Sequence, residues 1–331
     1  MAVNLPPQYH EAEERFRKAK TPEEKLVALR EMWVLLPKHK ASEKLQADLK
    51  RRISELTDQI EHARTAPKRT GATVHKIPRQ GAGQVVLLGP PNAGKSRLLA
   101  ALTQATPVVA PYPFSTREPL PGMMTYEDVR IQLVDLPPIT AEHYDHFLTD
   151  ITRGADAALL FLDLSDDDGP QATQAVIDRL AKARRLLVPP GTPAPEDPAQ
   201  YALPTLLVAT KADDPAADIR LALAREVFDD TYPWQTISAE RGEGLDELRQ
   251  AIFRLLNVIR IYGKEPGRPP DRSSPFTLPQ GSTVADLAEH IHRDLGEKVK
   301  SARVWGSATF PGQTVGRDYI LQDQDIVELQ I

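Results

Sequence analysis

The spacing of hydrophobic residues predicts a helical first part of the chain. Thr21-Pro22-Glu23-Glu24 has the features of a helix start, with Thr21 as the N-cap, Pro22 in the first turn and Glu24 closing a capping box. Two apolar stripes with helical spacing follow, the second of them after the potential cap Ser42: Leu26, Leu29, Trp33 and Leu36, then Leu45, Leu49, Leu56 and Ile60. These stripes predict a helical hairpin, followed by a polar, basic linker over residues 65–80.

The middle part, residues 81–263, alternates strand and helix patterns, which predicts a parallel sheet with helices on both faces. Strands are expected at 129–136, 156–164 and 205–210, and the second of these is apolar throughout, as in strands buried on both faces. A helix is expected at 171–187, followed by a proline-rich surface loop.

The third part, residues 264–331, has enough apolar residues for a small core. Thr283 is expected to cap a helix with Val284, Leu287, Ile291 and Leu295 on one face. Short strands are expected on either side of it, among them 302–306 and 325–330. We therefore predict three domains, at 1–80, 81–263 and 264–331.

Composition and charge narrow the class of protein. The 331 residues include no cysteine, which excludes disulfides, thiolate metal sites and cysteine nucleophiles. The N-terminus has no secretory signal pattern, and no apolar run is long enough to span a membrane, so we expect a cytoplasmic protein. Residues 1–80 contain 17 Lys and Arg against 11 Asp and Glu, although the whole chain has a net charge of −5. This basic end indicates either a polyanionic partner or a solvated helix face.

The strongest chemical signal is Gly89-Pro90-Pro91-Asn92-Ala93-Gly94-Lys95-Ser96, which fits the phosphate-binding pattern G-x-x-x-x-G-K-[ST]. A strand pattern precedes it and a helix pattern follows it. In this context, backbone N–H groups can surround phosphate oxygens at the start of a helix. Lys95 is expected to reach the β- and γ-phosphates, and the Ser96 hydroxyl to bind Mg²⁺.

Thr210-Lys211-Ala212-Asp213 follows a buried strand at its carboxyl end, where open α/β sheets bind ligands. The Asp213 carboxylate can accept hydrogen bonds from N1–H and N2–H₂ of guanine, whereas adenine offers no such pair of donors. Ser238-Ala239-Glu240 is expected to present a backbone N–H to guanine O6. Asp135, at the end of a strand, is placed to hold Mg²⁺ through water. Thr116, in the loop after the first helix, can offer its hydroxyl to Mg²⁺ when a γ-phosphate is bound.

These segments resemble the five guanine-nucleotide motifs of the Obg/DRG GTPases. The resemblance extends to the basic helical segment 39–60, to V-I-R-I-Y-G at 258–263, and to the last 60 residues, which look like a TGS domain. It implies an α/β P-loop GTPase domain, preceded by a helical hairpin and followed by a small β-grasp domain, that hydrolyses GTP with Mg²⁺ and associates with ribosomes or structured RNA. DNA is not an expected partner. The implied catalytic residues are Lys95 and Thr116, and the implied nucleotide contacts are Gly89, Asn92, Ala93, Gly94, Lys95, Ser96, Arg97, Thr210, Lys211, Asp213, Ser238, Ala239 and Glu240.

The chain departs from this family at switch II. Pro138 stands where the family has a glycine whose N–H contacts the γ-phosphate, and proline has no N–H. Ile139 stands where Ras-like enzymes place a glutamine that orients water. The nucleophile must then be positioned otherwise, for example by K⁺ held at Asn92. Alternatively, Asn92 only braces the loop.

Two further hypotheses stay open. The protein could be a nucleotide-sensing adaptor with little turnover, because Pro138 and Ile139 make switch II atypical. The TGS region could also bind a small ligand or a protein instead of RNA, because its charges are mixed.

Finally, the spacing between Asp135 and Lys211 leaves no room for the extra subdomain that DRG proteins carry there.

Overall fold

The computed structural model describes residues 15, 22–35, 49, 77–103, 118–228 and 231–330. The chain forms two compact units, Met1–Val74 and His75–Ile331. In the described ranges, no helix is long and apolar enough to cross a membrane.

In the first unit, helix α2 spans Pro22–Leu35, as the capping and spacing signals predict. It buries Ala28, Leu29 and Met32, and its Glu31 forms an ion pair with Arg15 at 2.8 Å. The predicted N-cap Thr21, almost all of the second helix and most of the basic linker lie outside the described residues.

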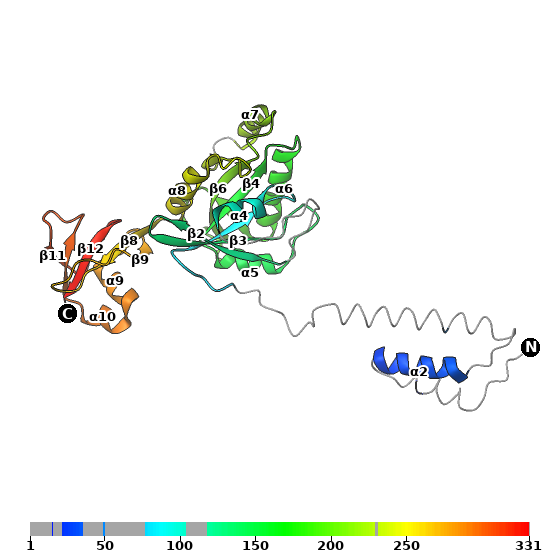
Figure 1. Ribbon diagram of the computed structural model, residues 1–331, viewed down its shortest axis with the longest axis horizontal. Coiled ribbons are helices and arrows are strands. Elements are labelled where there is room, and N and C mark those ends of the chain that lie inside the picture. Colours follow the sequence, from blue (N-terminus) through cyan, green and yellow to red (C-terminus); the bar gives the residue numbers. More distant parts are fainter. Residues whose placement is uncertain are drawn as a thin grey trace, which may run out of the picture. The chain divides into compact units, whose positions relative to one another are not determined.

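A seven-stranded sheet forms the core of the larger part of the second unit (Figure 1). Its order is β2-β3-β1-β4-β6-β5, with β7 also paired to β6. Only β2 runs antiparallel to its neighbour. The carboxyl ends of β1, β3, β4 and β6 therefore meet at one edge, which is where such sheets bind ligands. The strands are β1 (Gln84–Leu88), β2 (Leu120–Tyr126), β3 (Val129–Asp135), β4 (Ala157–Asp163), β5 (Arg185–Val188), β6 (Tyr201–Thr210) and β7 (Trp234–Thr236).

Helices pack on both faces of this sheet. On one face α4 and α8 contribute Leu98, Leu99, Leu248 and Ile252 to the core, and on the other α5, α6 and α7 contribute Leu148, Val176, Phe228 and others. Every residue of β1 and β4 is buried, which explains their continuous apolar sequences. The helices are α4 (Lys95–Leu102), α5 (Phe147–Gly154), α6 (Gly169–Lys182), α7 (Ala217–Phe228) and α8 (Leu245–Leu256).

The predicted helix 171–187 is wrong at its C-terminal end. Helix α6 ends at Lys182, and Arg184 adopts the left-handed conformation, with φ of 60°. Residues Arg185–Val188 instead form β5, which pairs in parallel with the first half of β6. A short apolar run beside a helix does not reveal its own conformation. The first half of β6 offers a free edge for pairing, and this pairing determines that residues 185–188 form a strand.

The C-terminal part of the chain forms a second, five-stranded sheet, in the order β11-β10-β12-β8-β9. Helix α9 buries Leu287 and Ala288 in its core, and Thr283 caps this helix in a capping box with Asp286. The predicted helix is interrupted at His292, so that Leu295 lies on a separate helix, α10. The elements are β8 (Val258–Gly263), β9 (Phe276–Pro279), α9 (Val284–Ile291), α10 (Arg293–Lys298), β10 (Ser301–Trp305), β11 (Gln313–Gly316) and β12 (Asp325–Gln330).

Strand β8 does not lie where the sequence placed it. We expected 258–263 at the end of the middle domain, but β8 pairs with β9 and β12 and so belongs to the second sheet. Its partners come from later in the chain, which is why its own residues did not reveal its position.

One buried arginine connects the two sheets. Arg260 of β8 is 4% exposed. It donates to Glu127 and Asp128 in the turn between β2 and β3, and to Asp323 of the second sheet's domain. Tyr262 also donates to Asp128, and the Arg260 guanidinium lies over the Phe253 ring of α8. The β2–β3 hairpin is thus bonded to the C-terminal domain.

Candidate nucleotide-binding site

The loop between β1 and α4 has the backbone shape that its sequence predicts. Gly89 passes so close to β4 that a Cβ there would lie 2.8 Å from the Cβ of Phe161. Asn92 and Gly94 both adopt positive φ, of 60° and 86°, and α4 starts directly after Gly94. Without a side chain at Gly89 and Gly94, the loop can close at the N-terminus of the helix, where an anion is favoured.

Lys95 reaches back across this loop. Its ammonium group donates to the carbonyl oxygens of Gly89, at 3.2 Å, and Pro90, at 2.9 Å. The residue is 6% exposed. Burial lowers the pKa of Lys95 to about 8, although the nearby Asp135 carboxylate opposes this shift. A phosphate next to Lys95 would supply the counter-charge that a buried ammonium lacks.

Ser96 and Asp135 meet at the same point. The Ser96 hydroxyl donates to Oδ2 of Asp135, at the end of β3. The second carboxylate oxygen, Oδ1, is buried and has no hydrogen-bond partner in the described part of the chain. Burial also raises the pKa of Asp135, while Ser96 and Lys95 oppose that shift. Because buried polar atoms normally have partners, this orphaned oxygen next to a hydroxyl fits a hydrated Mg²⁺ ion.

The residues after β3 are packed inward. Pro137, Pro138 and Ile139 are all buried, and Ile139 lies in the hydrophobic core beside α5. The Ile139 N–H donates to the carbonyl of Gly89 at 3.1 Å. Pro138 has no N–H to offer, and that of Ile139 is already used, so the segment presents neither group to a γ-phosphate.

At the other end of the site, β6 is bonded to the phosphate loop. The Thr210 hydroxyl lies 3.0 Å from the carbonyl oxygen of Ala93 and 3.1 Å from that of Leu162. Lys211 follows, with φ of 59°, and its ammonium group donates to Asp163 at 2.5 Å and to Ser165 at 3.1 Å. These contacts fix the stem of Lys211 beside the position expected for a base.

Asp213 is oriented by a serine from the following loop. The Ser238 hydroxyl, fully buried, donates to Oδ1 of Asp213 at 2.5 Å and accepts from the Arg241 N–H at 3.1 Å. The hydrogen bond from Ser238 lowers the pKa of Asp213, which stays ionised at neutral pH. A fixed, charged carboxylate is the group needed to accept two N–H donors from a guanine edge.

Arg97 and Glu240 form an ion pair that the sequence did not predict. The guanidinium group of Arg97, on α4, lies 2.5 Å from the Glu240 carboxylate, in the loop after Ser238 and the partly exposed Ala239. The pair joins α4, which follows the phosphate loop, to the loop between β7 and α8. Both side chains are well exposed, so the pair contributes little to stability.

Most of the predicted site residues therefore lie near one another at one edge of the sheet. The exception is Thr116, which lies outside the described residues. Sequence reasoning also missed Asp163 and Ser165. Their signal was available, because Asp163 ends a buried apolar strand at the same edge as Asp135 and Thr210.

Comparison with known families agrees with this site. The profile of the family described as 50S ribosome-binding GTPase matches residues 84–189, which include the phosphate loop, Asp135 and Asp163. The profile of the TGS domain matches residues 259–330, which form the second sheet and its helices. The second match begins at β8 and so agrees with the strand pairing.

Several related proteins match this chain over most of its length and most of their own. An uncharacterized GTP-binding protein of Methanocaldococcus jannaschii is 27% identical, over 93% of this chain and 93% of its own length. The developmentally-regulated G-protein 1 of Arabidopsis thaliana is 27% identical over 88% of this chain and 87% of its own. The ribosome-interacting GTPase 1 of Saccharomyces cerevisiae is 25% identical over 92% and 98%. The two profiles show a GTPase domain followed by a C-terminal TGS domain, and these relatives support a GTPase of the DRG type.

Proposed function

We propose that this GTPase uses the cluster of Lys95, Ser96 and Asp135 to bind the phosphates of GTP with Mg²⁺, and that its nucleotide state controls association with ribosomes or structured RNA. The observation that carries the first part is the orphaned Asp135 oxygen beside the Ser96 hydroxyl and the buried Lys95 ammonium. A phosphate–Mg²⁺ group satisfies all three at once. Replacing Lys95 with Ala should therefore abolish hydrolysis and strongly weaken binding.

The side chains of Ser96 and Asp135 fit an Mg²⁺ ion that substrate phosphates also coordinate. They fit less well a metal ion that protein groups alone would coordinate. Among the described residues no group of three His, Cys, Asp or Glu side chains is arranged to hold a metal ion. Mg²⁺ usually takes one or two protein oxygens plus substrate phosphates and waters. Ser96 would bind the ion directly and Asp135 through water, with Thr116 joining when GTP is bound. When bound, the ion would neutralise charge that develops on the phosphate oxygens.

Guanine selection by Asp213 can be tested by changing the base. Replacing Asp213 with Asn exchanges one acceptor oxygen for an N–H₂ donor, so the site should lose affinity for GTP. It should gain affinity for xanthosine triphosphate, whose base carries an acceptor at the corresponding position. Calorimetry with GTP, ATP and xanthosine triphosphate measures this. Equal affinity of the unaltered protein for GTP and ATP would refute guanine selection.

Asn92 allows two roles in the same loop. Its positive φ is equally consistent with a brace for the loop and with a side chain aimed at a K⁺ ion beside the phosphates. Hydrolysis rates in KCl and NaCl of equal concentration separate the two. Equal rates in both salts, with Asn92→Ala having the same effect in each, leave only the brace.

Association with ribosomes rests on domain composition and on one relative. The TGS domain and the G domain occur together here, as in the yeast relative named as ribosome-interacting, and residues 1–80 are basic. Pelleting of the full chain with ribosomes should be strongest with a non-hydrolysable GTP analogue, weaker with GDP, and reduced by salt. Pelleting that ignores both nucleotide and salt would remove this role.

A second candidate function is that of an adaptor that binds GTP or GDP with little turnover. The buried Ile139, whose N–H is bonded to Gly89, and Pro138, which has no N–H, favour it. Single-turnover hydrolysis with and without ribosomes separates the adaptor from the enzyme. A rate that stays at the level of the Lys95→Ala variant, even with ribosomes, supports the adaptor.

A further inference from the structure

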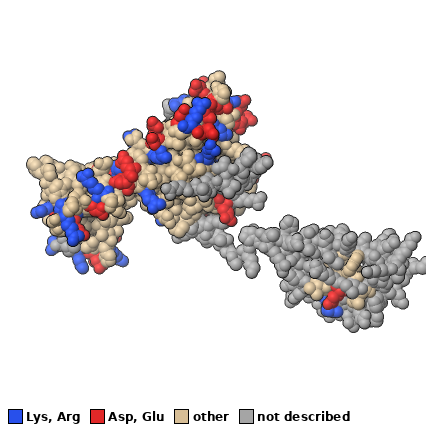
Figure 2. Space-filling view, viewed as in Figure 1, with Lys and Arg blue, Asp and Glu red and all other residues tan. Residues whose placement is uncertain are grey.

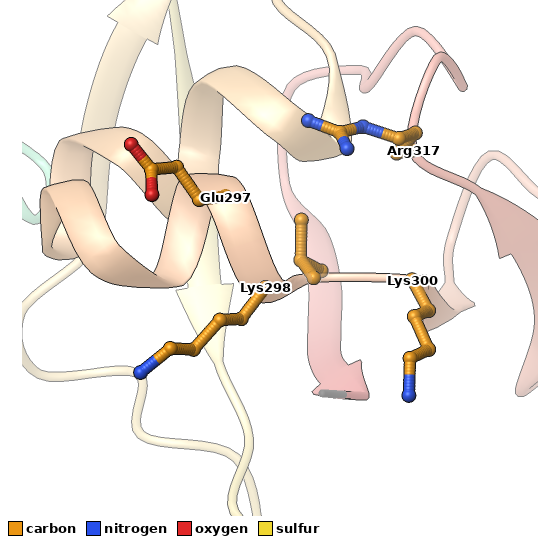
Figure 3. Close-up of a pocket in the computed structure, with 5 residues that line it drawn as sticks. Glu297, Lys298, Lys300 and Arg317 are labelled. Carbon is orange, nitrogen blue, oxygen red and sulfur yellow. The ribbon is translucent and has the colours of Figure 1, made fainter.

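A cluster of basic side chains surrounds an open hollow on the TGS domain, far along the chain from the nucleotide site. The hollow has a volume of about 530 Å³ and is lined by Glu297, Lys298, Val299, Lys300 and Arg317 (Figure 3). In the described part of the chain, none of its three basic side chains forms an ion pair. By contrast, Lys264 and Arg260 of the same domain each have a carboxylate partner.

The fold holds these three residues in place. Val299 is 2% exposed and packs in the domain core, so Lys298 and Lys300 are fixed on either side of a buried anchor. The Lys300 N–H donates to the carbonyl of Gln330 on β12 at 3.0 Å. The Arg317 guanidinium donates to the carbonyl of Gly296, in the last turn of α10, at 3.0 Å.

Strand register places two of the basic residues at opposing backbone positions. Ser301 of β10 is paired with Gly316 of β11, so Lys300 and Arg317 occupy the next opposing positions beyond this ladder. The one carboxylate in the lining, Glu297, points away from both lysine ammonium groups (Figure 3). The lining therefore offers no carboxylate to neutralise the lysine charges, and an anion from outside the domain would do so.

The arrangement favours an extended anion. The three basic groups lie apart around the hollow and do not converge on one point (Figure 3). Several Lys and Arg side chains cover the TGS surface around α10, with acidic side chains among them (Figure 2). A single small phosphate could contact only one of the separated groups closely, whereas consecutive phosphates of a nucleic-acid backbone could reach all three.

We propose that Lys298, Lys300 and Arg317 form a binding site for the phosphodiester backbone of structured RNA. The proposal rests on the proposed association with ribosomes or RNA, and it assigns that contact to one end of the TGS domain. Lysine and arginine contacts of this kind bind the backbone without reading sequence, and they release counterions as they form.

The test compares two triple variants of the full chain. The pocket variant carries Lys298→Gln, Lys300→Gln and Arg317→Gln. The control carries Arg272→Gln, Arg293→Gln and Arg303→Gln, which are exposed TGS residues outside the lining. Both remove three positive charges, so a general effect of net charge would appear equally in the two. Thermal melting checks that both variants fold.

Binding of a fluorescent RNA hairpin is measured as a function of salt. The slope of log K against log salt is negative, and its magnitude should decrease by about 2 to 3 in the pocket variant, because each lost phosphate contact removes nearly one unit. The control should keep the slope of the unaltered protein. Equal losses in both variants, or no loss in the pocket variant, would overturn the proposal. So would full competition by pyrophosphate at equal phosphate concentration, which would indicate a site for a small anion.

This outcome can be separated from that of the proposed function. If the unaltered protein pellets with ribosomes but binds no free RNA, the inference fails and ribosome association stands, with a protein as the contact. If it binds RNA through the pocket but does not pellet with ribosomes, the inference stands and ribosome association fails.

Discussion

At the scale of single residues, the site depends on charges buried close together. Lys95 and Asp135 lie beside one another with little access to water, and burial shifts the pKa of each toward its neutral form. Nothing in the motif G-x-x-x-x-G-K-[ST] specifies these shifts. They follow from how completely the sheet edge and the loop surround the two side chains.

The lowered pKa of Lys95 predicts that nucleotide binding depends on pH. Below pH 8 the ammonium form is already present and can meet a phosphate. Above pH 8 the free protein loses this proton and must take it up again on binding, because phosphate raises the pKa in the complex. The dissociation constant for GTP should therefore rise above pH 8 by up to about tenfold per pH unit.

A fluorescence titration of nucleotide binding from pH 7 to pH 9.5 measures this effect. The Lys95→Ala variant serves as the control, because its weaker binding should lack the rise above pH 8. A constant affinity of the unaltered protein across this range contradicts the prediction.

Pro138 predicts weak discrimination between GTP and GDP. Replacing Pro138 with Gly introduces an N–H at the position where the resemblance to Obg/DRG GTPases implies a contact with the γ-phosphate. A hydrogen bond to a charged group contributes about 1.5 to 3 kcal/mol, so the preference for GTP over GDP should increase about tenfold or more. The control is Pro137→Gly, which gives similar flexibility one residue earlier and should leave the preference unchanged. The idea fails if both variants behave alike.

At the scale of elements, the β2–β3 hairpin connects the nucleotide site to the C-terminal domain. One end of β3 is Asp135 at the site, and the turn at its other end carries Glu127 and Asp128, which bind Arg260. The hairpin also follows the segment that contains Thr116. It therefore lies between the two segments expected to respond to the γ-phosphate.

Replacing Arg260 with Met should destabilise the second unit strongly. The change keeps apolar bulk over Phe253 but removes the guanidinium that neutralises Asp128 and Asp323, and breaking a buried ion pair costs about 3 kcal/mol. Urea unfolding measures the loss. The matched control is Arg268→Met, which removes an exposed ion pair with Glu265 and should cost less than about 1 kcal/mol. Similar losses in both variants would show that the Arg260 contacts contribute little.

At the scale of the whole molecule, the same junction predicts that nucleotide binding reaches the TGS domain. Saturating GDP stabilises the folded state, by about 2.7 kcal/mol at 100 times its dissociation constant. Because Arg260 bonds the hairpin to β8, amides of β8 and β12 should exchange more slowly with nucleotide bound. Hydrogen exchange with GDP and with ATP measures this. Protection confined to residues before 257, or equal protection in the Arg260→Met variant, contradicts the coupling.

Much of this fold and site was predictable, and the exceptions share a cause. Local sequence predicts the backbone geometry of the motifs at 89–96, 210–213 and 238–240, because glycines, a helix start and strand ends are local features. By contrast, β5 was predicted as helix, and β8 was assigned to the wrong sheet. Asp163 was missed as the partner of Lys211. Each of these depends on a strand edge or side chain distant in sequence.

The sequence by itself determined which chemical groups this protein brings to its proposed site: a phosphate-binding loop pattern, the Asp213 carboxylate that we propose for guanine, and a Pro138 that cannot donate a hydrogen bond. These follow from residue types at fixed spacing, which act through the local backbone. Only the tertiary structure decided that Ser96 meets Asp135, that Ser238 orients Asp213, and that Arg260 joins the two sheets. Those contacts arise when segments far apart in the chain are packed against each other, and no local pattern encodes which side chains then face each other.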